Sequence, residues 1–508
     1  MSTNIKHRTV IMLDPELDDL NTIVRYLLYS NHFHTEGIIY SSSRYHWRGD
    51  GQGTRFLGES EHSDLGIGPI TCWRWDEDSR FIEEAVDIYA KVYQNLSIHA
   101  EGYPHPSELR ERIFNGNIAF PGDLSHCTQG SEHLMRLILD DEPGPLYVLT
   151  GTGQSTIGRA LKSIEERYLH TEKWENIYNK VSAKVIIQSF GDQDGIYETY
   201  IHPNWPNIRF RQMATTIWGY FARSVVQPED RHYLSAAWIK ENISSVGPFG
   251  EFYRVWGDGK YMHKNDITDY FGFKYLTANQ LKALGYSLWY KDIEEPGSWI
   301  SEGDTSMFMN LIDNGLEGHV DASYGGWGGR NGKDIAPDGV ASKDYASARW
   351  FGACQRDFAA RLQWTVTPEY KQANHHPIIE LINTESAIVA PGQTITLKAI
   401  ARDPDGHHLS VNWWQYEEAG AYPGQVELIS LDEVIEKEAT QTYPFDVPAP
   451  NSLNLSHLIQ DEVITACTFN IPTDTVKGQT IHCIVEAIDH CKIPLTSYKR
   501  IVLTVDDE

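Results

Sequence analysis

The sequence has no long apolar run. None of its 508 residues belongs to a stretch of about eighteen or more apolar positions, so no segment is expected to cross a membrane as a helix and no membrane partner is expected. Residues 1–8 are polar and have neither the apolar core nor the small-residue cleavage site of a signal peptide. The chain as written is therefore expected to be cytoplasmic, and secreted only if a signal peptide has been removed.

Cysteine is scarce and scattered. The six cysteines form no CxxC pair, which argues against a zinc ribbon or a thioredoxin-type centre, and they are too few for a dense disulfide framework. Cys467, Cys483 and Cys491 are close enough in sequence to approach one another, but buried free thiols are the favoured state.

Basic residues are fewer than acidic residues. The chain has 43 Lys and Arg against 70 Asp and Glu, a formal net charge of −27 that repels the phosphates of nucleic acids and argues against them as partners. A hydrophobic content of 41% is ordinary for a globular protein. Because single cores stop growing near ~250–300 residues, a chain of 508 residues is expected to form two domains.

Residues 1–370 alternate short apolar runs with amphipathic stretches. This pattern predicts βαβ units around a mostly parallel sheet flanked by helices, an α/β domain. The predicted strands are Thr9–Leu13, Glu36–Ser41, Pro145–Thr150 and Ala183–Phe190, and the predicted helices are Asn21–Ser30 and Phe81–Leu96. Thr367-Pro368 and the stretch Asn374–Pro377 end the helical character, so we place the domain boundary between residues 370 and 371.

Residues 371–508 predict an immunoglobulin-like β-sandwich. Six runs rich in β-branched and aromatic residues are separated by turns: Ile378–Ile382, Thr394–Ala399, Leu409–Trp414, Val463–Phe469, Thr480–Ala487 and Arg500–Val505. Trp413 and Trp414 alternate along one strand, so one of them is expected in the core. An exposed aromatic pair for carbohydrate binding and a purely bracing domain both stay open.

Four carboxylates follow the first strand, in the turn Asp14-Pro15-Glu16-Leu17-Asp18-Asp19. Ligands of open α/β sheets bind at the carboxyl ends of the strands. Like charges this close raise one another's pKa values unless a cation neutralises them, and hard oxygen donors favour Ca²⁺ or Mg²⁺ over zinc. The alternative is that Asp18 and Asp19 are simply acidic residues of a first helical turn.

Three further segments are candidates for the same edge. Leu149–Thr156 ends a strand in small residues, but it lacks the lysine of a phosphate-binding loop. Asp192, Gln193 and Asp194 follow another strand and are predicted to bind sugar hydroxyls, with an ordinary turn as the alternative. Trp327 lies between two glycine pairs, where it either stacks on a sugar ring or plugs the core.

The motif Asp14-Pro15-x-x-Asp18-Asp19 after an apolar strand resembles the N-terminal acidic signature of nucleoside hydrolases. The following stretch, Ile23–Asn31, narrows the resemblance to the nucleoside-hydrolase-like family described as cellulose-binding. Further matching pieces are Tyr93–Leu96, Gly102–Pro104, Asp192–Asp194, Glu302–Thr305, Tyr324–Arg330, Asp403–Gly406 and Trp413–Tyr416. The resemblance extends over nearly the whole chain.

The resemblance implies a Ca²⁺ site, with Mg²⁺ less expected. Its metal ligands are Asp14, Asp19, a backbone carbonyl of the Leu149–Gly151 segment, taken as Gly151, and Asp304. Asp18 is implied to bind sugar hydroxyls, and Glu16 is expected to be peripheral. Asp14 is further implied to be the catalytic base, which takes a proton from a calcium-bound water that attacks an anomeric carbon with inversion.

The sequence departs from the nucleoside-hydrolase pattern at two positions. Met12 stands where those enzymes usually have an earlier aspartate, and Gly303 precedes Asp304 where they often have a histidine that helps the base leave. Glu302 lies one residue further back. We therefore predict that Glu302 is the catalytic acid that protonates a departing sugar oxygen.

These features together predict a calcium-dependent glycoside hydrolase that cleaves a furanosyl or similar glycosidic bond. The alternatives are an N-ribosyl (nucleoside) hydrolase and a non-catalytic carbohydrate-binding protein. The expected partner is a carbohydrate or nucleoside substrate. Because nucleoside hydrolases are often oligomeric, the resemblance also allows a homo-oligomer, although no interface can be read from the residues.

Overall fold

A parallel sheet of six strands forms the centre of the first domain in this computed structural model, which describes residues 6–213, 215–382, 386–431 and 462–506. The strand order is β3-β2-β1-β4-β5-β6, and every neighbouring pair is parallel. The strands are β1 (His7–Leu13), β2 (Phe33–Tyr40), β3 (Ile113–Asn115), β4 (Leu146–Thr150), β5 (Val185–Ser189) and β6 (Arg209–Gln212). The strand order reverses between β1 and β4, so a crevice is expected at their carboxyl ends.

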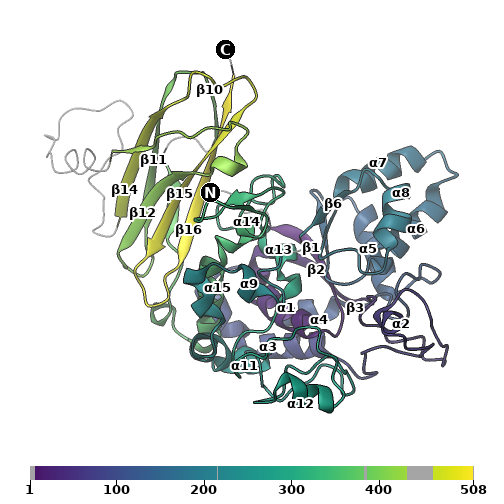
Figure 1. The fold of residues 1–508 in the computed structure, drawn as a ribbon. Coiled ribbons are helices and arrows are strands. Elements are labelled where there is room, and N and C mark those ends of the chain that lie inside the picture. The colour runs from purple at the N-terminus through teal and green to yellow at the C-terminus, as the bar shows by residue number, and fades with distance from the viewer. Residues whose placement is uncertain (1–5, 214, 383–385, 432–461, 507–508) are drawn as a thin grey trace, which may run out of the picture.

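Helices cover both faces of this sheet (Figure 1). On one face, Ile11 and Leu13 of β1 join a core with α1 (Leu17–Leu28), α3 (Phe81–His99) and α15 (Phe351–Val366). On the other face, Val10 and Met12 pack with α5 (Gln129–Leu139), α6 (Ser155–Tyr168) and α7 (Trp174–Lys184). Burial on both faces explains why the central strands are continuous apolar runs.

The shorter helices and strands lie in the connections. They are α2 (Glu61–Asp64), α4 (Pro106–Glu111), α8 (His202–Asn204), α9 (Ala222–Val225), α10 (Ala236–Ile239), α11 (Gly247–Phe252), α12 (Ala278–Ala283), η5 (Gly303–Thr305), α13 (Ser306–Met309), β7 (Asp334–Ile335), β8 (Ala341–Ser342) and α14 (Tyr345–Ala348). No helix within the described ranges combines the length and the apolar character needed to cross a bilayer.

The second domain is a sandwich of two four-stranded sheets, ordered β10-β16-β15-β12 and β13-β14-β11-β9. Its strands are β9 (Ile378–Leu381), β10 (Ser386–Val389), β11 (Thr394–Arg402), β12 (Leu409–Gln415), β13 (Ile429–Ser430), β14 (Glu462–Asn470), β15 (Thr480–Asp489) and β16 (Thr496–Val505). All pairs are antiparallel except β10 with β16. The proposed boundary after residue 370 lies in the connection between α15 and β9.

The predicted elements are confirmed, with shifted ends. Strand β1 begins two residues before the predicted start at Thr9, and α1 begins at Leu17 rather than Asn21, so that Asp18 and Asp19 fall in its first turn. Acidic side chains are favoured there by the helix dipole. The prediction missed β3, β6, β7, β8, β10 and β13, which are two to four residues long and too short to show a clear alternation.

Aromatic side chains pack where the two domains meet. Trp413 lies in the sandwich core, where its indole N–H donates to Thr465 Oγ1 at 3.0 Å. Trp414 and Tyr416 instead pack against Trp350 of the first domain, with ring centroids 6.0 and 5.9 Å away. The alternative of an exposed aromatic pair for carbohydrate is therefore wrong, because Trp414 of β12 and Tyr416, which follows the end of this strand, both pack against the first domain.

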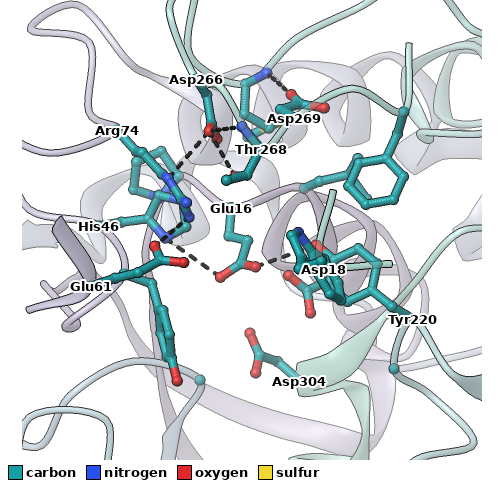
Figure 2. Close-up of a pocket in the computed structure, with 18 of the residues that line it drawn as sticks. Glu16, Asp18, His46, Glu61, Arg74, Tyr220, Asp266, Thr268, Asp269 and Asp304 are labelled. Atoms are coloured by element: carbon teal, nitrogen blue, oxygen red, sulfur yellow. Dashed lines mark hydrogen bonds and ion pairs between the residues drawn. The ribbon is translucent and has the colours of Figure 1, made fainter. Parts of the chain in front are cut away.

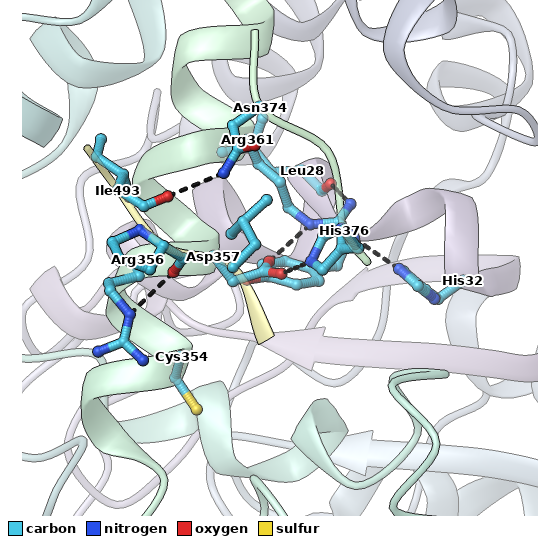
Figure 3. Close-up of polar contacts among 12 residues, drawn as sticks. Leu28, His32, Cys354, Arg356, Asp357, Arg361, Asn374, His376 and Ile493 are labelled. Carbon is cyan, nitrogen blue, oxygen red and sulfur yellow. Dashed lines mark hydrogen bonds and ion pairs between the residues drawn. The ribbon is translucent and has the colours of Figure 1, made fainter. Parts of the chain in front are cut away.

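The connection after α15 is fixed by buried polar contacts (Figure 3). Asp357 of α15 accepts hydrogen bonds from Arg361 Nε at 2.8 Å and from His376 Nε2. Asn374 Nδ2 donates to the carbonyl of Ile493, in the loop before β16, at 3.0 Å. These contacts bind the connecting segment to both domains.

Candidate functional site

A cavity of about 480 Å³ lies at the carboxyl ends of β1 and β4, where the strand order reverses. Strand β1 leads into the acidic turn and β4 leads into Gly151, so the fold brings both predicted segments to the cavity. Its lining includes Glu16, Asp18, Tyr45, His46, Glu61, Arg74, Gly151, Phe190, Gln193, Thr216, Tyr220, Phe221, Asp266, Asp269, Trp289 and Asp304.

Of the predicted carboxylates, Asp18 and Asp304 line this cavity, whereas Asp14 and Asp19 are buried behind its lining and interact electrostatically with them. Asp14 and Asp19 are 1% exposed, Asp304 is 2% exposed, and Asp19 Oδ1 accepts the backbone N–H of Asp14 at 3.0 Å. Figure 2 shows Glu16, Asp18 and Asp304 facing one another across the pocket. The expectation that Glu16 is peripheral is wrong, since carboxylate oxygens of Glu16, Asp18 and Asp19 lie within 4.8 Å of one another.

Two glycines permit this close approach. A Cβ atom at Gly151 would stand 2.4 Å from Asp304 Oδ2, and one at Gly303 would stand 2.3 Å from Asp18 Oδ2. A side chain at either position would push an acidic residue away. Gly303, which replaces the histidine of the nucleoside-hydrolase pattern, therefore has a steric reason to be glycine here.

The cluster is electrostatically unfavourable when every member is ionised. Burial raises the pKa of Asp14, of Asp19 and of Asp304 well above the ordinary value, and the neighbouring carboxylates raise each of them further. Burial also raises the pKa of Asp18 to about 6, and that of Glu16 well above its usual range. Such a group of acids either holds protons or neutralises its charge with a cation.

The donor set fits a hard divalent cation such as Ca²⁺. Both carboxylate oxygens of Asp14 and Oδ1 of Asp18 are buried and accept no hydrogen bond of full geometry from the residues that the structure describes. Ca²⁺ binds six to eight oxygen ligands, chiefly carboxylates and carbonyls. The side chains whose ligand atoms lie within 4.8 Å of one another are Glu16, Asp18 and Asp19 in one group and Asp14, Glu16 and His46 in another, and Asp304 belongs to neither group. The Gly151 carbonyl accepts a hydrogen bond from Gln193 Nε2 at 2.8 Å, which leaves it one lone pair.

A histidine that the sequence did not single out completes the cluster. His46 is 3% exposed, and its Nδ1 lies 3.3 Å from Asp14 Oδ1 and 3.4 Å from Glu16 Oε2. It is held in the loop after β2 by its backbone N–H, which donates to Ser43 Oγ at 3.2 Å. Burial lowers the pKa of His46 well below its ordinary value, so the neutral ring faces the acids.

One cation of the chain itself borders the cavity. Arg74 has a positive φ of 50° and is 7% exposed. Its guanidinium pairs with Glu61 Oε2 at 2.7 Å and with Asp266 Oδ1 at 3.2 Å. Arg74 attracts Asp14 and Glu16, but it already pairs with two other carboxylates, so its single positive charge cannot balance the whole acidic cluster.

The three residues of the triplet Asp192-Gln193-Asp194 have different surroundings. Gln193 lines the cavity, whereas Asp192 accepts the backbone N–H of Glu198 at 3.1 Å. Asp194 accepts the backbone N–H groups of Gln154 and Ser155 at 2.8 and 2.9 Å, at the start of α6. The predicted sugar contact of Asp194 is wrong, because it does not line the cavity and its carboxylate caps α6. Asp192 does not line the cavity either, although its Oδ1 is buried without a hydrogen-bond partner among the described residues.

Glu302 does not occupy the predicted place of a catalytic acid. It is fully buried and does not line the cavity. Arg25 Nε donates to its Oε2 at 2.5 Å and Arg25 Nη2 to its Oε1 at 2.9 Å, while Tyr253 and Thr305 donate to the same carboxylate. A carboxylate that accepts four hydrogen bonds in the core, away from the cavity lining, is out of reach of a substrate in the cavity.

Trp327 and Met12 belong to the core. Trp327 is 2% exposed and packs with the apolar core of the first domain, so its predicted stacking on a sugar is wrong. Met12 is fully buried on the opposite sheet face, among Val148 and Ile187. At the position where nucleoside hydrolases usually have an aspartate, the Met12 side chain therefore contributes only apolar packing to the core on this face of the sheet.

Exposed aromatic side chains stand at the mouth of the cavity. Trp289 is 40% exposed and Phe221 is 49% exposed, with ring centroids 6.0 Å apart. Tyr220 packs edge-on against Trp289 at 4.5 Å. These are the apolar ring faces on which a sugar can stack, and the sequence offered no periodic signal for them.

A doubly covered parallel sheet with buried acids at the point of strand reversal, followed by a β-sandwich, defines a nucleoside-hydrolase-like protein with an appended domain. The model "Cellulose-binding Sde182, nucleoside hydrolase-like domain" matches residues 8–331, and the model "Cellulose-binding protein Sde0182, C-terminal domain" matches residues 394–505. The chain belongs to this cellulose-binding, nucleoside-hydrolase-like family.

A solved structure that covers nearly the whole chain shows the same fold. A nucleoside hydrolase-related hypothetical protein from Saccharophagus degradans, associated with carbohydrate metabolism, has a TM-score of 0.65 at 22% identity and covers 99% of this chain and 100% of its own. A mutant SrpA adhesin from Streptococcus sanguinis has a TM-score of 0.16 at 13% identity, covering 26% of this chain and 57% of that one. The chain matches no curated protein.

Proposed function

We propose that the chain is a Ca²⁺-dependent glycoside hydrolase that cleaves a furanosyl or similar glycosidic bond in the cavity beside the acidic turn. The observation that carries the proposal is Asp14, whose two buried carboxylate oxygens meet no hydrogen bond of full geometry within the described residues, although the Ser43 hydroxyl and His46 Nδ1 stand beside them. Burying an unpaired carboxylate is costly unless it binds a cation or takes a proton during a reaction. The position of this carboxylate in the acidic cluster favours both uses.

Different residues of the chain bind the cation, accept the proton and bind the sugar. Asp14, Asp19 and Asp304 hold the cation, and Asp14 accepts the proton of the attacking water. Asp18, at the edge of the cavity, accepts hydrogen bonds from sugar hydroxyls, and the Gln193 side chain orients the loop through the Gly151 carbonyl. A bound Ca²⁺ supplies charge neutralisation and lowers the pKa of a coordinated water.

The first test substrates are chosen by how much protonation their leaving groups need. Since Arg25 holds Glu302 in the core, the predicted acid is not available to an O-glycoside. Aryl glycosides carry leaving groups that need little protonation, so aryl furanosides are the first test substrates. Inosine and uridine in the same panel test the N-ribosyl alternative.

The experiment compares the wild-type chain with Asp19→Ala in Ca²⁺. We expect hydrolysis of an aryl furanoside by the wild type and a loss of roughly 10²-fold or more in the variant, the scale for removing a preorganised electrostatic group. Asp141→Ala is the matched control, because this aspartate is fully exposed and pairs with Lys180 on the surface. Full activity in Asp19→Ala contradicts the proposal.

One observation favours a second candidate, a carbohydrate-binding protein without turnover. Trp289 and Phe221 offer exposed aromatic faces at the cavity mouth, and the family is described as cellulose-binding. This candidate predicts that cello-oligosaccharides bind by titration calorimetry, that Trp289→Ala abolishes binding, and that no member of the glycoside panel is hydrolysed.

A further inference from the structure

A second group of metal-ligating side chains lies at one end of the β-sandwich, far in sequence from the acidic turn. The loop Asp403–His407 joins β11 to β12, and Asp489 and Cys491 lie where β15 leads toward β16. Strands β12 and β15 are paired so that Leu409 stands opposite Asp489. The pairing brings the two loops together, and the backbone N–H of His490 donates to the His408 carbonyl at 3.0 Å.

Two groups of three ligand atoms lie in these loops, and the atoms of each group are close enough to share an ion. Those of His407, Asp489 and Cys491 all lie within 4.8 Å of one another, and so do those of Asp403, Asp405 and His407. His407 belongs to both groups. Its Nδ1 stands 3.4 Å from Asp403 Oδ1.

Two of these atoms are buried without a hydrogen-bond partner. The Asp403 side chain is fully buried, and its Oδ2 has no partner among the described residues, although its Oδ1 accepts the backbone N–H groups of Asp405 and His407 at 2.9 and 3.0 Å. Nδ1 of His407 is also buried and unpartnered. The hydrogen bonds within the loop satisfy Oδ1 of Asp403. They give no partner to Oδ2 of Asp403 or to Nδ1 of His407, so a bound ligand is a reason for both atoms to be buried there.

The chemistry of the donors selects the ion. A thiol sulfur, an imidazole nitrogen and carboxylate oxygens together suit Zn²⁺, whereas Ca²⁺ and Mg²⁺ take oxygen donors. Asp405 pairs with His375 instead, since its carboxylate accepts the backbone N–H of His375 at 2.7 Å and contacts that ring at 2.9 Å. Asp489 accepts the backbone N–H groups of Cys491 and Leu495 at 2.9 and 3.0 Å, and it still has a ligand oxygen within 4.8 Å of His407 and Cys491. His407 links this group to Asp403, which gives four donors for a tetrahedral site.

We propose that Asp403, His407, Asp489 and Cys491 bind Zn²⁺, which ties the two loops of the sandwich together. Binding replaces the Cys491 S–H bond with an S–Zn bond and releases the proton to solvent. Asp489 also accepts a hydrogen bond from Asn374 of the interdomain connection at 2.9 Å (Figure 3 shows Asn374 with its second partner, Ile493). The ion therefore stabilises the end of the sandwich that meets this connection.

The test uses the full chain, stripped of metal with a chelator and returned to saturating Ca²⁺ so that the acidic turn does not compete. Co²⁺ is the spectroscopic probe. The wild type is expected to bind one Co²⁺ with a thiolate-to-cobalt charge-transfer band and tetrahedral visible bands, and added Zn²⁺ is expected to displace it. Cys491→Ser removes the charge-transfer band, and Cys72→Ser, at an exposed cysteine remote in sequence, retains it.

His407→Gln gives a second readout. Zn²⁺ is expected to raise the unfolding temperature of the wild type and of Cys72→Ser, and to leave that of His407→Gln unchanged. A wild-type spectrum without a sulfur band overturns the proposal. So does a band that survives Cys491→Ser or disappears with Cys72→Ser, and so does protection by Zn²⁺ that is equal in His407→Gln.

Discussion

Glu302→Gln separates a structural role for this residue from a catalytic one. The substitution leaves Arg25, which is fully buried, without its charged partner. The guanidinium keeps the side chain of Gln355 at 2.6 Å and the ring of Phe358 at 3.9 Å, but neither carries a negative charge. Removing one partner of a buried ion pair costs about 3–5 kcal/mol, because the other charge stays desolvated and uncompensated.

The assay is equilibrium unfolding in urea, followed by fluorescence and by circular dichroism. Glu302→Gln is expected to lower the midpoint of the first domain, and the double substitution Arg25→Met, Glu302→Leu is expected to recover most of the loss, since apolar side chains of similar volume can replace a buried pair. Below its midpoint, Glu302→Gln should keep wild-type Ca²⁺ affinity. An unchanged midpoint together with lost activity would refute the structural role and restore Glu302 as an acid.

Three further predictions concern the cavity and its neighbours. Asp18, whose pKa burial raises to about 6, binds its proton more tightly in the folded chain than in the unfolded chain, where the pKa is about 3.9. The metal-free chain should therefore lose stability as the pH rises from about 4 through 6, and melting curves in chelator and in Ca²⁺ should diverge above that range. Gly151→Ala places a Cβ 2.4 Å from Asp304 Oδ2, so calorimetry should show weakened Ca²⁺ binding, whereas Gly144→Ala, in an open exposed turn, leaves it unchanged. Asp194→Ala removes the acceptor for the first N–H groups of α6 and should cost about 0.5–2 kcal/mol in urea unfolding, and an altered KM without lost stability would contradict this role.

The predictions of fold and site that the structure confirmed rest on short, local sequence patterns. The strands of the parallel sheet are buried on both faces and read as apolar runs, and the acidic turn follows the first of them directly. The reversal of strand order then places that turn beside Gly151. A motif at the end of a strand is predictable because the sheet fixes where the strand ends.

Residues brought in from long loops were not predictable in this way. His46 and Arg74 reach the cavity from irregular segments that have no periodicity. Glu302 is held in the core by Arg25, which is 277 positions away in the sequence, so no local pattern could show that it does not reach the cavity. Trp327 appeared exposed because glycines flank it, yet tertiary packing closes over its indole.

The most direct test of the central claim is Ca²⁺ titration calorimetry on the metal-free chain at neutral pH, with Asp304→Asn and Asp141→Ala beside the wild type. Asp304→Asn preserves the shape of a residue that is 2% exposed at Gly151 and removes only its charge. The account predicts one Ca²⁺ bound by the wild type and by Asp141→Ala through this site, and affinity reduced by roughly tenfold or more in Asp304→Asn, at about 1.4 kcal/mol per factor of ten. Absence of Ca²⁺ binding by the wild type, or equal affinity in Asp304→Asn, would contradict it.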